Sequence, residues 1–357
     1  MPAIWLIDAY RAGERGQVRA LADALSESLG WPCRRIALEY RKQVLLPHIL
    51  GQASVRGLRP ESTAQLAPPW PDLVITCGVR NEPVCRWIRE QSGGRTRYLH
   101  LGRPWGALDG FDLVVTTPQY RVPDRGNVVN NALTLHAVTA QRLAGERARW
   151  TPEFDAMPQP RIAVNVGGNS GPFTFGPRAA LRLAREASEL ARRQGGSLLV
   201  STSSRTPPVA AEMLERNIDV PHRVYRWRAG DPDNPYFGML ALADSVIVTA
   251  DSIAMLSEAC ATGKPVHMFD PGGMRDDVKL RRDFRLGGVL YGMLMRWFPQ
   301  RLSRDISLVH RQLVQDRRAS WLGSMDSDDP VEPVNDMANT IAAVRGLFPE
   351  LSDAVAG

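Results

Sequence analysis

Two segments in the second half of the chain carry residue types suited to binding a diphosphate. "VGGNSG" follows an apolar run and supplies Gly168, Asn169 and Ser170, and glycines let backbone N–H groups approach an anion closely. "STSSRTPP" supplies Ser203 and Arg205, and a guanidinium binds phosphate through two parallel hydrogen bonds. Both segments predict a phosphate site. A flexible glycine turn and a helix-capping turn are the alternatives.

A third segment, "VTADSIAMLSEACATGKPV", combines a predicted strand with a predicted helix. Asp251 or Ser252 caps this helix, Ile253 lies at its start, and Glu258 falls in its second turn. A carboxylate there can accept hydrogen bonds from both hydroxyls of a vicinal diol. The alternative is a solvated glutamate near the positive end of the helix dipole.

In the first half, "DAYRAGERGQ" predicts a strand, a glycine-containing loop with Gly13, Gly16 and Gln17, and then a helix. Asp8 and Glu14 are the acids here that could serve as a general base. The GxGxxG fingerprint is absent, which disfavours a Rossmann dehydrogenase. Walker A, HExxH and GxSxG sequences are absent as well, and the six histidines lack metal-ligand spacing, so we expect no metal.

The elements that would position these residues alternate between strand and helix throughout the chain. Short apolar runs broken by helical patterns favour buried parallel strands, and we predict an α/β fold of two doubly wound, Rossmann-like domains facing a cleft. Ligands of such sheets bind beyond the carboxyl ends of the strands. The predicted boundaries are a first domain over 1–150, a linker over 151–160, a second domain over 161–330, and a final helix within 331–357 that could cross back to the first domain.

Composition and charge limit the choice of cellular compartment and of binding partners. The chain has 357 residues, no apolar run near the ~20 needed to span a bilayer, and no basic start typical of a signal peptide. Its four cysteines form no CxxC pair, which favours thiols in a reducing cytoplasm. Residues 275–318 hold eleven Arg or Lys and five Asp, an excess of six that equals the net charge of the whole chain. A local basic patch indicates an acidic partner, and a solvated helical face is the alternative.

Within that patch, "LGGVLYGMLMRWF" has helical apolar spacing with arginines around it. This pattern predicts an interfacial helix on an anionic membrane, with ordinary core or a seam between domains as the alternative. The apolar positions are Leu286, Val289, Leu290, Met293, Leu294, Trp297 and Phe298.

Together these segments resemble a known family. "VGGNSG" and "ALADSVIVTADSIAMLSEACATGKPV" are similar to the GT-B glycosyltransferases, in particular the N-acetylglucosaminyltransferase of peptidoglycan synthesis. "VSTSSRTP", "DNPYFGMLALAD" and "VTADSIAMLSEACATGKPV" resemble more narrowly the bacterial relatives of the plant elongated-mitochondria fission protein, which are described as GT-B glycosyltransferases. The resemblance spans nearly the whole chain and is most specific over 201–266.

The resemblance implies donor-binding roles for residues of the second domain. It implies that Glu258 holds the ribose hydroxyls, that Arg205 faces the diphosphate, and that Tyr225 and Arg226 lie by the nucleobase. It places Gly168, Asn169 and Ser170 at the diphosphate and sugar. Ser252 and Ile253 lie at the helix start that approaches the phosphates. Asp251 and Ser203 are further candidates for donor binding.

The expected activity is the transfer of a sugar from a nucleotide-diphosphate sugar, without a metal ion or a further cofactor. The acceptor is unknown, and an envelope or lipid-linked saccharide is one option. Gln17 stands where peptidoglycan-type enzymes carry a histidine, and an amide is no general base. A non-catalytic adaptor on the same scaffold and a sugar-nucleotide epimerase are therefore kept as alternatives. We expect a cytoplasmic protein, with peripheral attachment to the inner membrane face as an option, and no nucleic-acid partner. The oligomeric state is left open.

Overall fold

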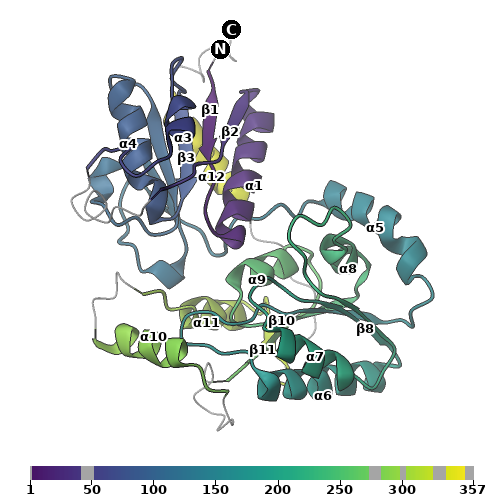
Figure 1. Ribbon diagram of the computed structural model, residues 1–357. Helices are drawn as coiled ribbons and strands as arrows, with labels where there is room; N and C mark the ends of the chain where they lie inside the picture. The colour runs from purple at the N-terminus through teal and green to yellow at the C-terminus, as the bar shows by residue number, and fades with distance from the viewer. Residues whose placement is uncertain (1, 42–51, 273–282, 298–302, 325–334, 350–357) are drawn as a thin grey trace. The chain divides into compact units, whose positions relative to one another are not determined.

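The computed structural model describes residues 2–41, 52–272, 283–297, 303–324 and 335–349. It divides into two compact units, Met1–Ala137 with Asn335–Gly357, and Val138–Val334. Each unit contains one six-stranded sheet in which all the paired strands run parallel (Figure 1). The predicted fold class, two Rossmann-like α/β domains in one chain, is confirmed. That they face each other across a cleft stays a prediction.

The first unit has the strand order β2-β1-β3-β4-β5-β6. Its strands are β1 (Ile4–Ile7), β2 (Cys33–Ile36), β3 (Leu73–Cys77), β4 (Arg97–Leu101), β5 (Leu113–Thr116) and β6 (Val128–Asn130). Its helices are α1 (Ala12–Leu29), α3 (Pro60–Ala64), α4 (Glu82–Gln91) and α12 (Asp336–Arg345), with short 3-10 turns at Val79–Asn81, Leu108–Gly110 and Pro118–Tyr120.

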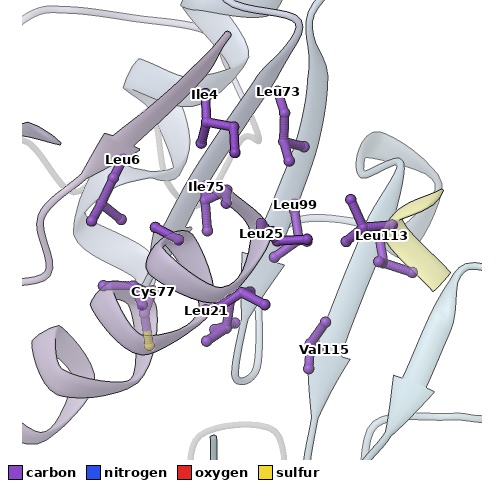
Figure 2. Packing of buried hydrophobic residues seen from close by; sticks show 14 of the residues in the cluster. Ile4, Leu6, Leu21, Leu25, Leu73, Ile75, Cys77, Leu99, Leu113 and Val115 are labelled. Carbon is purple, nitrogen blue, oxygen red and sulfur yellow. The ribbon is translucent and has the colours of Figure 1, made fainter. Parts of the chain in front are cut away.

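The core of this unit explains why its strands appear in the sequence as apolar runs. Strands β1 and β3 pair in parallel, and their residues are buried on both faces of the sheet. On one face, Leu21 and Leu25 of α1 pack against strand residues such as Ile75 (Figure 2). Helix α12 joins the same cluster through Val344. The Asp336 carboxylate accepts hydrogen bonds from two backbone N–H groups after β6, so the end of the chain belongs to the first unit.

The second unit has the strand order β12-β11-β10-β7-β8-β9. Numbered from β7, this is the 3-2-1-4-5-6 order of dinucleotide-binding domains. The strands are β7 (Arg161–Asn165), β8 (Ser197–Ser201), β9 (His222–Tyr225), β10 (Ser245–Thr249), β11 (Val266–Phe269) and β12 (Ser320–Trp321). The helices are α5 (Ala140–Phe154), α6 (Pro177–Gln194), α7 (Pro208–Arg216), α8 (Tyr236–Leu242), α9 (Ile253–Cys260), α10 (Leu286–Trp297) and α11 (Ser307–Gln315).

Helix α6 illustrates how the sequence sets the ends of these elements. Proline occupies its first position, where no backbone N–H is needed, and Gly195 ends it with a φ of 69°, a left-handed conformation that favours glycine. Alanines line its inner face, which lets the helix approach the sheet closely. Those fully or nearly fully buried are Ala179, Ala180, Ala184, Ala187 and Ala191.

Two boundary predictions differ from the structure. Thr151–Phe154 belong to α5 and not to a linker, and the division between the units lies at Ala137–Val138. The α5 sequence shows little apolar periodicity because only Trp150 and Phe154 of this helix are buried. The segment "AGERGQ" was expected to form a loop, but it forms the first turns of α1. Among the described residues, no helix is both long and apolar enough to cross a membrane.

Candidate functional site

The switch point of the second sheet lies between β7 and β10. These strands are neighbours, yet the chain continues from β7 to β8 on one side and from β10 to β11 on the other. The loops that follow β7 and β10 therefore leave the same edge of the sheet and diverge, which creates the position where such folds bind ligands. The predicted phosphate segment and the predicted start of α9 are these two loops.

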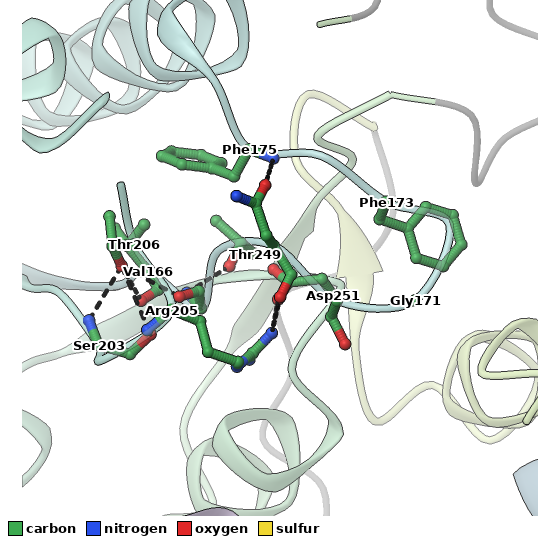
Figure 3. A network of polar contacts seen from close by, with 12 residues as sticks. Val166, Gly171, Phe173, Phe175, Ser203, Arg205, Thr206, Thr249 and Asp251 are labelled. Carbon is green, nitrogen blue, oxygen red and sulfur yellow. Dashed lines mark hydrogen bonds and ion pairs between the residues drawn. The ribbon is translucent and has the colours of Figure 1, made fainter. Parts of the chain in front are cut away.

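Two consecutive glycines allow the loop after β7 to pass close to its neighbours (Figure 3). The Gly167 N–H donates to Thr249 Oγ1 of β10 at 2.7 Å. A Cβ atom on Gly167 would lie 2.6 Å from the Asp251 carboxylate, and one on Gly168 would lie 2.2 Å from the Arg205 carbonyl oxygen. Gly168 also has a φ of 128°, which side chains rarely permit. The glycines are needed for close packing of three loops.

A buried carboxylate orients a partly exposed guanidinium at this edge. Arg205 Nη1 donates to Asp251 Oδ2 at 2.7 Å and to the Asn169 carbonyl oxygen at 3.2 Å (Figure 3). The Asp251 side chain is 0% exposed, whereas that of Arg205 is 36% exposed. Within the described part of the chain, Arg205 Nε and Nη2 make no hydrogen bond. The free N–H groups of a fixed cation are available to an anion.

Buried polar atoms without partners accumulate at the same edge. Neither Nδ2 nor Oδ1 of Asn165, the last residue of β7, has a hydrogen-bond partner among the described residues, and neither does Asp251 Oδ1. Both side chains are buried. Since buried polar groups are normally paired, these atoms indicate a place where water or a polar ligand completes the hydrogen bonding.

The other predicted polar side chains of this cluster hold the loop itself. Asn169 Oδ1 accepts a hydrogen bond from the Phe175 N–H at 3.0 Å, and the Ser203 hydroxyl donates to the Gly167 carbonyl oxygen. The Ser170 hydroxyl accepts from Arg304 Nη2 at 2.6 Å. These side chains shape the loop, and Arg304 adds a second guanidinium beside it.

The N-terminus of α6 is occupied by a side chain of the protein itself. The Asp283 carboxylate accepts hydrogen bonds from the N–H groups of Gly176, Arg178 and Ala179 at 2.9–3.2 Å. This carboxylate satisfies N–H groups that would otherwise be free to bind an anion. The positive end of the α6 dipole therefore interacts with Asp283, and a phosphate at this edge would be attracted by the arginine side chains instead.

Glu258 lies on α9, the helix that follows β10, and a tyrosine side chain is hydrogen-bonded to it. Tyr236 of α8 donates its hydroxyl to Glu258 Oε2 at 2.5 Å. Burial raises the pKa of Glu258 to about 7, while the Tyr236 hydrogen bond and the nearby charge of Arg142 act in the opposite direction. Glu258 Oε1 has no hydrogen bond within the described residues. Ser252 and Ile253, at the start of the same helix, are buried.

Tyr225 and Arg226 are not joined to this cluster by any hydrogen bond in the described structure. The Tyr225 hydroxyl donates to Asp231 Oδ2 at 2.9 Å, and Arg226 binds Glu215 Oε2 through Nε and Nη2. Their side chains are thus paired at the end of β9. Their predicted position by a nucleobase remains a prediction.

In the first unit, the two candidate acids are both engaged. Asp8, directly after β1, receives hydrogen bonds from Nε and Nη2 of Arg19, at 3.0 and 2.5 Å. Glu14 Oε1 lies 3.6 Å from Arg11 Nη1, and Glu14 Oε2 lies 3.0 Å from the position of a Cβ on Gly78, the residue after β3. Arg19 donates to both carboxylate oxygens of Asp8, so this carboxylate is poorly placed to accept a proton from an acceptor.

The predicted acceptor-side residues lie on α1. Gly13 and Gly16 have open space where a Cβ would be, and Gln17 lines a small recess, open to solvent, at the carboxyl ends of β4 and β5. The other lining residues include Gly102, Thr116 and Thr117, with Tyr120 and Asn131. The recess offers hydroxyl and amide groups to a polar molecule.

Sequence reasoning missed four residues that this geometry makes prominent. Arg304, Tyr236 and Asp283 contact site residues from distant parts of the chain, and Thr249 holds Gly167. The only signal for Arg304 was the basic excess of its region. Among the described residues, no group of three His, Cys, Asp or Glu side chains could hold a metal ion.

Comparison with known proteins places these features in context. The chain is 28% identical over 239 residues to the "Mitochondrial fission protein ELM1" of Arabidopsis thaliana, covering 61% of this chain and 56% of that protein. It thus spans little more than half the length of this curated relative. It is 26% identical over 298 residues to the "Uncharacterized protein RP120" of Rickettsia prowazekii (strain Madrid E), covering 75% of this chain and 83% of that protein.

Similar solved structures include the ADP-heptose lps heptosyltransferase II of E. coli, with a TM-score of 0.46, 11% identity, and coverage of 98% of this chain and 99% of that one. A glycosyltransferase from Rickettsia africae ESF-5 has a TM-score of 0.49 and 12% identity, covering 98% of both chains. The family profile described as "Mitochondrial fission ELM1" matches residues 12–285. The chain therefore belongs to the Mitochondrial fission ELM1 family.

Proposed function

We propose that the second unit binds a nucleoside diphosphate sugar at the switch point of its sheet, and that the chain is a glycosyltransferase. The observation that carries this proposal is the Arg205–Asp251 pair: a fully buried carboxylate fixes a guanidinium whose remaining N–H groups are unpaired in the described structure. A diphosphate would complete the hydrogen bonding of Arg205 bidentately.

The same arrangement suits the chemistry of sugar transfer. As the glycosidic bond breaks, the leaving diphosphate gains negative charge, and fixed cations stabilise that charge without having to reorganise. Arg205 and Arg304, which donate hydrogen bonds to Asn169 and Ser170 of the loop after β7, would supply this stabilisation. We propose that these guanidinium groups take the part that a metal ion plays in other transferases.

The ribose would lie along α9. From Ser252 to Glu258 the helix rises by ~9 Å, which separates the phosphate end of the site from a carboxylate. Glu258 Oε1 can accept a ribose hydroxyl while Oε2 keeps its bond to Tyr236. Of the segment Gly168, Asn169 and Ser170, the Gly168 N–H would face the diphosphate, because the N–H groups of Asn169 and Ser170 already donate to the carbonyl oxygens of Arg205 and Phe173.

On the acceptor side, Glu14 is the better candidate for a base. It lies three residues before Gln17 on α1, and residues at this spacing share a helix face. An acceptor would then approach Glu14 beside the small recess lined by Gln17. The engaged Asp8 and the amide of Gln17 favour one rival, a non-catalytic adaptor that binds nucleotide without turnover.

Thermal melting in the presence of nucleoside diphosphates and sugar nucleotides tests donor binding. A ligand that binds the native state raises the melting temperature with concentration. We expect such a rise in the parent protein and its loss in Arg205→Ala, with Arg216→Ala, a surface arginine of α7 paired with Glu212, as the matched control. No shift with any nucleotide, or equal shifts in both variants, would refute the site.

Turnover separates the enzyme from its rivals. Release of nucleoside diphosphate that depends on an acceptor supports transfer, and is expected to fall in Glu14→Gln. Binding without release across donors and acceptors would indicate the adaptor, and formation of a new sugar nucleotide without an acceptor would indicate an epimerase.

A further inference from the structure

Helix α10 exposes its apolar face and packs against the protein through Gly288. Leu286, Val289, Leu290, Met293 and Trp297 fall within an arc of about 100° around the helix axis. All five side chains are exposed, Trp297 at 77%, and so is Phe284 just before the helix, at 81%. Apolar side chains gathered on one exposed face indicate an interaction surface.

The opposite face of α10 is the one in contact with the protein. Gly288 is the buried residue of the helix, and a Cβ on it would lie 2.9 Å from the Pro172 carbonyl oxygen. The Tyr291 ring lies 3.2 Å from the position of a Cβ on Gly171. The exposed stripe is therefore not a face that the described part of the second unit uses for its own packing.

Charge distinguishes among the partners that this face could take. Helix α10 contains no acidic residue, and Arg296 is exposed beside Trp297. The described residues 283–297 and 303–318 hold six Arg and three Asp, an excess of three positive charges. A second copy of this chain would bring like charges together across a symmetric interface. An anionic bilayer surface instead complements the charge and accepts the apolar stripe.

We propose that α10 is an interfacial helix that docks on anionic lipid. Leu286, Leu290 and Met293 would enter the boundary between headgroups and acyl chains, with Trp297 at the level of the headgroups. Arg296 would contact the lipid phosphates. Residues 275–282 and 298–302, which complete the basic segment predicted from the sequence, lie outside the described residues.

Docking would also place the candidate donor loop next to the membrane. Arg285 Nη2, just before α10, donates to the Gly171 carbonyl oxygen at 2.6 Å and to the Phe173 carbonyl oxygen at 3.2 Å. Only this coupling depends on the proposed function. Lipid binding itself is independent of whether the chain binds a nucleotide.

Sedimentation of the full-length chain with vesicles tests the proposal. We expect binding to phosphatidylcholine vesicles that contain phosphatidylglycerol, weaker binding to phosphatidylcholine alone, and loss with added salt as charges are screened. Leu290→Glu is expected to lower vesicle affinity by about tenfold or more. The control is Val209→Glu on α7, an equally exposed apolar position at which the same charge change should leave affinity unchanged.

Tryptophan fluorescence gives a second measurement. Brominated lipids should quench the parent protein more than Trp297→Phe, because Trp297 is expected to lie at the bilayer surface. Absence of binding at low salt, or equal affinity of Leu290→Glu and Val209→Glu, would overturn the proposal. A change in oligomeric state or a loss of thermal stability in Leu290→Glu without lipid would also overturn it, since the stripe would then be a protein-packing surface.

Discussion

The Arg205–Asp251 pair predicts an asymmetric response to its two single substitutions. Arg205→Ala leaves the Asp251 carboxylate, which is 0% exposed, without its cation. Leaving one member of a buried ion pair without its partner lowers the free energy of unfolding by about 3 kcal/mol. Asp251→Asn keeps an oxygen that can accept from Arg205, and the arginine side chain is 36% exposed and can be hydrated. This change should therefore lower the free energy of unfolding by only about 1 kcal/mol.

The double variant separates the two contributions. When Arg205→Ala and Asp251→Asn are combined, no buried charge remains unpaired. The free energy of unfolding should then be close to that of Asp251→Asn alone, so the coupling between the two substitutions is about 3 kcal/mol. Urea unfolding followed by tryptophan fluorescence and circular dichroism measures all four proteins. Two probes are needed because the two units can unfold separately.

The control is Arg216→Ala, which removes one partner of the exposed Arg216–Glu212 pair and should change stability by less than about 0.5 kcal/mol. Additive effects of Arg205→Ala and Asp251→Asn, or a larger loss in Asp251→Asn than in Arg205→Ala, would show that the carboxylate does not depend on the arginine. The buried pair could then not be the device that fixes the cation.

Three further substitutions test other contacts of the second unit. Gly167→Ala would place a Cβ 2.6 Å from the Asp251 carboxylate and should lower the free energy of unfolding, measured in urea, by about 2 kcal/mol. As its control, Gly145→Ala, in open space on α5, should leave the free energy of unfolding unchanged or raise it. Asp283→Ala uncaps α6 and should lower the free energy of unfolding by about 1 kcal/mol. Glu258 has a pKa of about 7 in the folded state against about 4.3 when unfolded, so its contribution to stability is present below about pH 4 and is lost as pH rises through 7. Melting temperatures should therefore fall between about pH 5 and 8 in the parent relative to Glu258→Gln, and parallel curves would contradict the raised pKa.

Much of the fold could be predicted because parallel strands buried on both faces are mostly apolar. Leu73–Cys77 and Ser245–Thr249 are examples, and both are strands. Helix α5 was not predicted, because its buried residues are few and its other positions are polar. The start of α1 was expected to be a loop because it contains two glycines, but it is helical in the folded unit.

The candidate site could be predicted only as far as its loops are local. The segments after β7 and β10 were identified because strand order brings successive carboxyl ends to one edge. Side chains that reach the site from distant parts of the sequence could not be identified in this way. Ser170 and Arg304 are 134 residues apart, and nothing in the spacing of either predicts their hydrogen bond. The pairing of Glu258 with Tyr236 likewise depends on how α8 lies against α9.

The capping of α6 changes how an anion would be held in this chain. Asp283 already accepts from the N–H groups at the start of α6, and the N–H groups of Gly167, Asn169 and Ser170 donate within the protein, so a bound diphosphate would depend chiefly on guanidinium groups. Asp283 and Arg285 flank the start of α10, and both bind the loop between β7 and α6. A displacement of α10 would therefore change that loop through two ionic groups and the Tyr291 ring together. The surface proposed to meet lipid and the loop proposed to meet the donor are thus joined through Asp283, Arg285 and Tyr291, so a change at one is expected to alter the other.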